Sequence, residues 1–186
     1  MRAINGSRAW ALLVLGVCLA SCASTSPPMR FYTLSVVGGE SANANGPLSI
    51  RVARVTLPGE IDRAELVQRV DANRLQLADN DRWAAPLGEM VRRALSDDLR
   101  SRAPASSGDP DSLSVEIEEF IGDANCAVSL RAGWSLTRAG ADQPATRGYE
   151  TIRVDSQRAC SVGALPEAMS RALAQLSTRI ASSRTK

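Results

Sequence analysis

A short apolar run from Ala9 to Ala20 limits how the rest of the chain can be interpreted. It contains no charged residue, and Arg2 and Arg8 place positive charge ahead of it. The run is too short to cross a bilayer as a helix, which takes about 20 apolar residues. Positive charge followed by an apolar run of this kind is typical of a secretory signal peptide. We therefore expect the chain to be exported and to fold outside the cytoplasm.

The apolar run leads into residues 19–22, whose sequence Leu-Ala-Ser-Cys resembles the lipobox of bacterial lipoproteins. In that motif the cysteine thiol receives diacylglycerol, and the signal peptide is then removed in front of it. The resemblance predicts residues 1–21 as the signal peptide and Cys22 as the lipidated first residue of the mature protein. The alternative is an ordinary signal peptide that is cut near Ala20 or Ala23, with an incidental cysteine.

Lipidation ties a folded domain to a membrane without a spanning helix. Each buried CH2 group contributes about 0.8 kcal/mol, so one acyl chain holds weakly, whereas the two or three chains of a bacterial lipoprotein anchor stably. Resemblance to the sorting rules of these lipoproteins also implies a destination, because Asp after the cysteine favours the inner membrane and this chain has Ala23. We expect an outer-membrane lipoprotein that faces the periplasm, with residues 22–30 as a tether of about 25 Å.

Charge and histidine content exclude several classes of function. Of the 22 basic residues, Arg2 and Arg8 leave with the signal peptide, so 20 basic residues balance 20 acidic ones. A neutral chain without a basic patch argues against nucleic acid as a partner. The absence of histidine excludes Ser-His-Asp and Cys-His catalysis and His-containing zinc sites within the chain. We expect no enzymatic activity, metal or cofactor, and partners recognised by shape and apolar contact.

Two cysteines remain in the mature domain, Cys126 and Cys160. An even pair in an oxidising compartment favours a disulfide. Such a bond stabilises the fold by about 3–4 kcal/mol on the chain-entropy model. The alternative is two separate buried thiols, because a disulfide requires α-carbons within about 7 Å of each other.

The first half of the domain is expected to contain strands followed by a helix. Alternating and β-branched residues predict four strands, of which the last two form a hairpin, over residues 31–37, 48–52, 66–70 and 74–78. The apolar phase slips at Ala53 and Arg54, which indicates a bulge or the end of a strand. The polar run 79–81 is interpreted as a solvated turn. A helix is predicted to start at Pro86, with an apolar stripe that continues to Leu99.

The second half repeats this order of strands and then a helix. Alternation predicts three strands, of which the last two form a hairpin with a cysteine beyond each matching end, around residues 113–117, 126–136 and 149–155. A second amphipathic helix is predicted from Leu165 to Ile180, with Pro166 near its start. We expect an α+β domain over residues 31–186, with two amphipathic helices packed on one face of a largely antiparallel sheet.

Four segments of the mature chain carry a resemblance to a known family. They are Phe31-Tyr32-Thr33-Leu34, residues 50–58, Ile61-Asp62-Arg63 before Leu66-Val67, and residues 83–87 (Trp-Ala-Ala-Pro-Leu) at the first helix. In this order behind a lipobox they resemble the ABC-type transport auxiliary lipoproteins, which accompany MCE-type lipid transport systems. The resemblance covers essentially the whole mature chain, but it does not account for the cysteine pair.

The resemblance implies an accessory component of an ABC transporter that moves lipids between membranes and maintains envelope integrity. The ATPase, the permease and the MCE subunit, which is the expected partner, would be separate polypeptides. The absence of a phosphate-binding Gly-Lys-Ser/Thr loop fits this division. Asp62, Arg63 and Trp83 are candidate partner-binding residues. The alternative is structural: Trp83 packs over the first helix, and Asp62 and Arg63 fix a turn.

Two other functions remain open at this point. A lipid-binding carrier requires an apolar cavity between the sheet and the helices, and a structural lipoprotein supports the envelope or its peptidoglycan. The domain is also a candidate homo-oligomer, because a ring of copies could receive a tubular partner.

Overall fold

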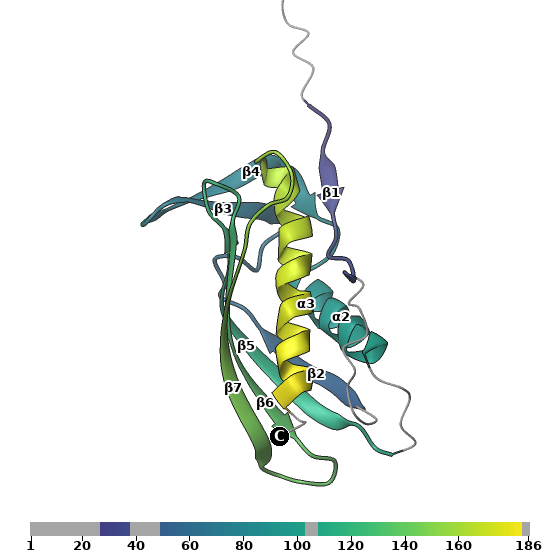
Figure 1. Ribbon diagram of the computed structural model, residues 1–186. Helices are drawn as coiled ribbons and strands as arrows, with labels where there is room; N and C mark the ends of the chain where they lie inside the picture. The colour runs from purple at the N-terminus through teal and green to yellow at the C-terminus, as the bar shows by residue number, and fades with distance from the viewer. Residues whose placement is uncertain (1–26, 38–48, 103–107, 184–186) are drawn as a thin grey trace, which may run out of the picture.

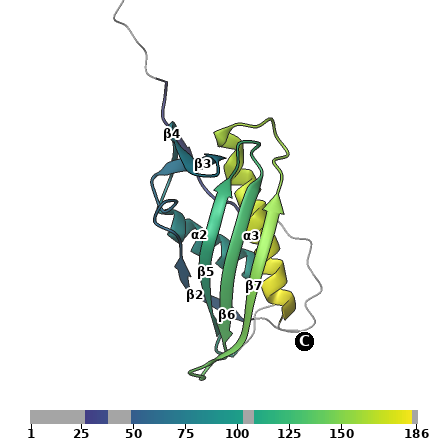
Figure 2. The ribbon, with the colours of Figure 1, turned by 90° about the vertical axis from the view of Figure 1, so that its left-hand side faces the viewer.

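Within residues 27–37, 49–102 and 108–183, which the computed structural model describes, seven strands form one mixed sheet. Two long helices cover one face of this sheet (Figure 1, Figure 2). This architecture confirms the predicted α+β class. The predicted signal peptide and Cys22 lie outside the described residues.

The strands and helices follow the predicted order. The strands are β1 (Arg30–Tyr32), β2 (Ile50–Thr56), β3 (Glu65–Asp71), β4 (Arg74–Trp83), β5 (Asp111–Gly122), β6 (Val128–Thr137) and β7 (Pro144–Val154). The helices are α2 (Leu87–Ser101) and α3 (Leu165–Ser183), and the short 3-10 helix η1 (Val162–Ala164) leads into α3.

The sheet contains both antiparallel and parallel pairs, and its order is β1-β4-β3-β5-β6-β7 with β2 beside β5. The β3–β4, β5–β6 and β6–β7 pairs are antiparallel. The β1–β4 and β2–β5 pairs are parallel, as is a single contact between β3 and β5. Both predicted hairpins are confirmed, and the parallel pairs make the sheet mixed.

Apolar stripes at helical spacing fix α2 and α3 to the sheet. On α2 the buried stripe consists of Leu87, Met90, Val91, Ala94, Leu95 and Leu99, which are the residues predicted for it. On the sheet, Leu113, Val115 and Ile117 of β5 are buried in the same core. Because strand side chains alternate between faces, the residues between them point to the uncovered face. No helix in the described part of the chain is both long and apolar enough to span a bilayer.

The amino-terminal strand is shorter than residues 31–37, the range predicted for it. β1 ends at Tyr32, because the following segment leaves the sheet and turns into the core. Leu34 is buried there, and the backbone N–H of Ser35 donates to Oγ of Ser170 on α3 (3.1 Å). The strand also begins one residue early, so Arg30, which was expected in the tether, belongs to the folded domain.

Residues 79–81 form the last part of β4, so the prediction of a solvated turn there was wrong. Cys126 was predicted as the first residue of a strand, but it lies in the turn before β6 with φ of 60°. The phase slip at Ala53 is a β-bulge, as expected, because the register of β2 against β5 shifts between Val52 and Arg54.

Candidate functional site

The described domain begins at β1, and an ion pair between exposed Arg30 and buried Asp81 holds this strand to β4. Asp81 is 6% exposed, and its carboxylate accepts hydrogen bonds from Nε and Nη2 of Arg30, both at 2.7 Å. The hydroxyl of Tyr32 donates to the same carboxylate (2.7 Å). The Arg30 hydrogen bonds hold the pKa of Asp81 below its ordinary value, against the opposing effect of burial. Charge-assisted hydrogen bonds therefore fix β1, the first strand of the described domain, to β4.

The structure brings the three candidate partner-binding residues, Asp62, Arg63 and Trp83, together around one shallow groove of about 400 Å3. We call this the anchor-side groove; its lining is completed by Ala64, Ala85 and Pro86. It lies beside β1, because Trp83 is the register partner of Tyr32. The groove is therefore close to β1, where the described domain begins.

A turn anchored in the core presents Asp62 and Arg63 to solvent. The backbone N–H groups of Ile61 and Asp62 donate to the carbonyl of Pro58, both at 3.1 Å, and Ile61 is buried. Nε of Arg63 lies 3.7 Å from Oε2 of Glu65, which gives Arg63 a weak ion pair. The side chain of Asp62 contacts no polar partner in the described residues. The turn places opposite charges at the rim of an apolar groove, which suits recognition of an apolar side chain flanked by polar groups.

Trp83 serves the core as well as the groove. Its side chain is 6% exposed and packs in the hydrophobic core, as the structural alternative for this residue requires. Its backbone N–H donates to the carbonyl of Ala64 (2.7 Å), which fixes the turn to the end of β4. Asp62 and Arg63 are consequently the two of the three candidates that a partner can reach fully.

A disulfide joins Cys126 to Cys160, whose α-carbons are 5.4 Å apart. Asp123 shapes the turn that positions Cys126, because its Oδ1 accepts hydrogen bonds from the backbone N–H groups of Asn125 (2.9 Å) and Ala127 (3.0 Å). The turn holds Cys126 in the left-handed region, which is unusual for a residue with a side chain. The bond ties the turn between β5 and β6 to the segment that leads into α3.

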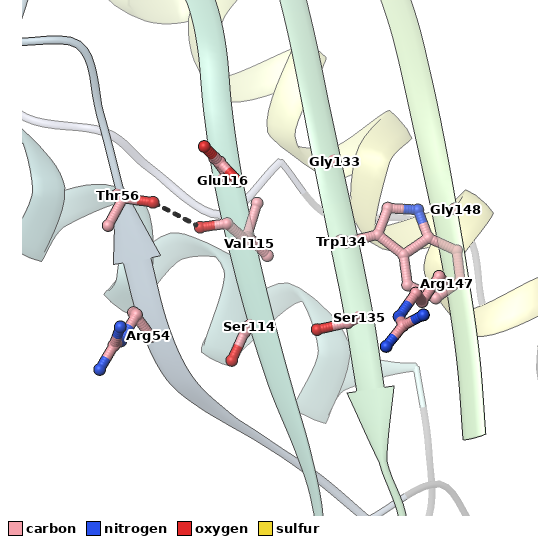
Figure 3. A pocket seen from close by; sticks show the side chains of 10 residues that line it. All are labelled: Arg54, Thr56, Ser114, Val115, Glu116, Gly133, Trp134, Ser135, Arg147 and Gly148. Carbon is pink, nitrogen blue, oxygen red and sulfur yellow. Dashed lines mark hydrogen bonds between the residues drawn. The ribbon is translucent and has the colours of Figure 1, made fainter. Parts of the chain in front are cut away.

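A second groove, which the sequence did not reveal, crosses the sheet face opposite the helices (Figure 3). We call it the open-face groove; it has a volume of about 490 Å3 and is lined mainly by Arg54, Thr56, Ser114, Glu116, Ser135 and Arg147. The residues at the bottom of the groove, Gly133, Ser114 and Ser135, have short side chains or none, which leaves the space above them open. Gly148 is required beneath it, since a Cβ there would lie 2.4 Å from the ring of Trp134. The groove cannot be recognised from the sequence of any single strand, because its residues come from β2, β5, β6 and β7.

Comparison with known proteins supports the fold and the family. The chain is 27% identical over 140 residues to the intermembrane transport lipoprotein PqiC of Escherichia coli (strain K12), which covers 70% of this chain and 75% of that protein. PqiC of Shigella flexneri matches to the same extent. These are relatives of the chain at moderate similarity.

Two crystal structures show the same fold at low sequence identity. A protein from Xanthomonas campestris superposes with a TM-score of 0.65 at 18% identity, covering 82% of this chain and 92% of that one. An uncharacterized protein superposes with a TM-score of 0.64 at 22% identity, covering 84% and 99%.

The model of one protein family matches residues 32–181, which is about four fifths of the 186-residue chain. The family is described as the ABC-type transport auxiliary lipoprotein component, and the match confirms the resemblance found in the sequence. The chain belongs to the family of ABC-type transport auxiliary lipoprotein components.

Proposed function

We propose that this chain is the outer-membrane lipoprotein of an MCE-type ABC transporter, in which it docks a periplasmic partner rather than catalysing a reaction. The transporter moves lipids between the inner and outer membranes and so maintains the envelope. The observation that carries the proposal is the family match over residues 32–181, directly behind a lipobox that ends at Cys22. The name of the PqiC relatives, intermembrane transport lipoproteins, supports the same process.

The geometry at the start of the domain supports a docking role. The tether joins β1, and the Arg30–Asp81 ion pair holds that strand in the sheet. The anchor-side groove lies next to it, with Asp62 and Arg63 exposed at its rim. An MCE subunit that contacts this groove is thereby kept within the length of the tether from the membrane that carries the lipid anchor.

A lipid-carrier role has less support from the described part of the chain. A carrier needs an apolar cavity between the sheet and the helices. The cavity found there, among Leu66, Trp83, Phe120 and Met169, has a volume of about 10 Å3. That volume is near the minimum for one water molecule and is far smaller than an acyl chain.

Replacing Cys22 by serine is expected to separate anchoring from docking. Without the acylated thiol, the protein loses the two or three chains that hold it in the membrane. We expect labelled palmitate to enter the wild type and not the variant, and the variant to be released as folded protein. It should bind the MCE subunit in vitro and fail to support the permeability barrier in cells. Equal palmitate labelling of the two proteins contradicts the assignment of Cys22.

Reversing both rim charges, Asp62→Arg with Arg63→Glu, is expected to weaken MCE binding in vitro by more than about tenfold, because charges at an interface rim set register and suppress misdocking. Both residues are exposed, so the melting temperature should change by less than about 2 °C. Arg92→Glu on the exposed surface of α2 is the matched control and should bind normally. Crosslinks in cells that go to peptidoglycan or a porin, with no MCE protein recovered, would favour the structural role instead.

A further inference from the structure

A row of four side chains crosses the uncovered sheet face at right angles to the strands. Strand pairing places Arg54 beside Ser114, Ser114 beside Ser135, and Ser135 beside Arg147. Neighbouring strands lie about 4.8 Å apart, so the α-carbons of the two arginines are about 14 Å apart. The serines between them are short, and the arginine side chains stand at the two ends of the open-face groove (Figure 3).

These two arginines differ from Arg131 and Arg153 on the same face, whose side chains are paired. Nε of Arg131 lies 2.9 Å from Oε2 of Glu119, and Nη2 of Arg153 lies 2.6 Å from Oδ2 of Asp123. The side chains of Arg54 and Arg147 form neither a hydrogen bond nor an ion pair with any residue that the structure describes. A free guanidinium binds a carboxylate through two parallel hydrogen bonds. The groove therefore offers one cationic site at each end of a polar floor.

The position of the groove in the fold argues for a ligand from the periplasm. Ser114 lies eight residues before Gly122 along β5, a distance of about 26 Å. Gly122 pairs with Gln68 of β3, in the part of the sheet where β1 lies (Figure 1). The groove is thus at the end of the domain away from β1. With the lipid anchor at Cys22, as proposed above, this is the end of the domain farther from the anchoring membrane.

We infer that the open-face groove binds an extended acidic segment of a periplasmic protein, with one carboxylate at each arginine. An extended chain advances about 3.4 Å per residue, so acidic residues four positions apart match the separation of Arg54 and Arg147. The low floor of Ser114, Ser135 and Gly133 admits only small side chains between them. The serine hydroxyls can donate hydrogen bonds to backbone carbonyls of the segment and accept them from its backbone N–H groups.

Glu116 supplies an internal control for this assignment. It lines the groove in the next row, its side chain is exposed, and it contacts no polar partner in the described residues. Its carboxylate repels an acidic ligand, so Glu116→Gln should strengthen binding, whereas Arg54→Glu with Arg147→Glu should weaken it. A ligand recognised by shape alone does not produce these opposite signs.

The test places photoreactive benzoylphenylalanine at Thr137, two residues along β6 from Ser135 on the same face, in the full-length lipoprotein in cells. After irradiation, mass spectrometry should identify a crosslinked peptide with two acidic residues four positions apart. We expect its yield to fall more than tenfold in R54E/R147E, to rise in E116Q and to stay unchanged in R92E. Changing the two acidic residues of the captured segment to arginine should restore the crosslink to R54E/R147E.

Several outcomes overturn the inference. They are a crosslink yield that R54E/R147E does not change, crosslinks that go to lipid, and crosslinks that go to a second copy of the chain. Melting curves of each purified variant establish that it is folded. The inference rests on the proposed function only for the side of the membrane that the groove faces. A charge-dependent crosslink without any MCE binding overturns the proposed function alone, and MCE binding with charge-independent crosslinks overturns this inference alone.

Discussion

Replacing Cys126 by alanine and Cys160 by serine is expected to lower the free energy of unfolding by about 3–4 kcal/mol. The disulfide closes a loop with a sequence separation of 34 residues, and on the chain-entropy model its removal frees the unfolded chain by this amount. For a domain of this size the loss corresponds to a decrease of roughly 10 °C in melting temperature. The measurement is thermal unfolding of the soluble domain with and without reductant.

Alanine is chosen at position 126 because the Cys126 side chain is fully buried, and a serine hydroxyl there would add an effect of its own. Cys160 is exposed, so serine is suitable at that position. Reduced wild type should melt close to the double variant, since both lack only the covalent bond. Hydrogen exchange should rise first in η1 and the first turn of α3, which the bond ties to the sheet. Equal melting temperatures for the oxidised wild type and the double variant would contradict the assigned role.

Both helices and both hairpins could be predicted because their signals are local. The stripe from Leu87 to Leu99 repeats every three to four residues, and the alternation along β6 repeats every two. The local sequence of residues 79–81 predicted a polar turn, and this prediction failed because of a distant contact. Asp81 is buried because Arg30, 51 residues away, supplies its counter-charge. A contact of that sequence separation leaves no local pattern.

The two grooves differ in how far the sequence could reveal them. The family resemblance singled out Asp62, Arg63 and Trp83, and the structure places all three on one groove. The open-face groove depends on the register of four strands. A slip of one residue turns every side chain of a strand to the opposite face. The bulge between Val52 and Arg54 sets which residues of β2 face outward, so the row that includes Arg54 is visible only in three dimensions.

A buried acid on α2 gives the domain an unusual dependence of stability on pH. Asp98 is 1% exposed, and neither of its carboxylate oxygens has a hydrogen-bond partner in the described residues. Burial raises the pKa of Asp98 from its ordinary value of 3.8 to about 6, although the charge of Arg102 opposes the rise. The folded state therefore holds this proton more tightly than the unfolded state does.

The sign of the pH effect follows from this difference. Below about pH 4 the Asp98 carboxyl is protonated in both the folded and the unfolded state, so its ionisation does not lower the free energy of unfolding. Between pH 4 and pH 6 the unfolded chain ionises first, so the stabilising effect of the bound proton is lost as the pH rises. A pKa raised from 3.8 to about 6 corresponds to about 3 kcal/mol of stability lost at neutral pH.

Asp98→Asn removes the titrating group and should reverse this trend. Relative to wild type, the free energy of unfolding of the variant is expected to rise by about 2–3 kcal/mol between pH 4 and pH 7, measured by urea unfolding at unit intervals. The substitution also removes the carboxylate beside Arg102, which adds an offset that is independent of pH. Asp97→Asn is the matched control, because Asp97 is exposed and paired with Arg100 (2.8 Å). The difference in free energy of unfolding between this variant and wild type should vary by less than about 0.5 kcal/mol over the same pH range. If the Asp98→Asn difference is flat across this range, the pKa of Asp98 is not raised in the folded protein, and the prediction is contradicted.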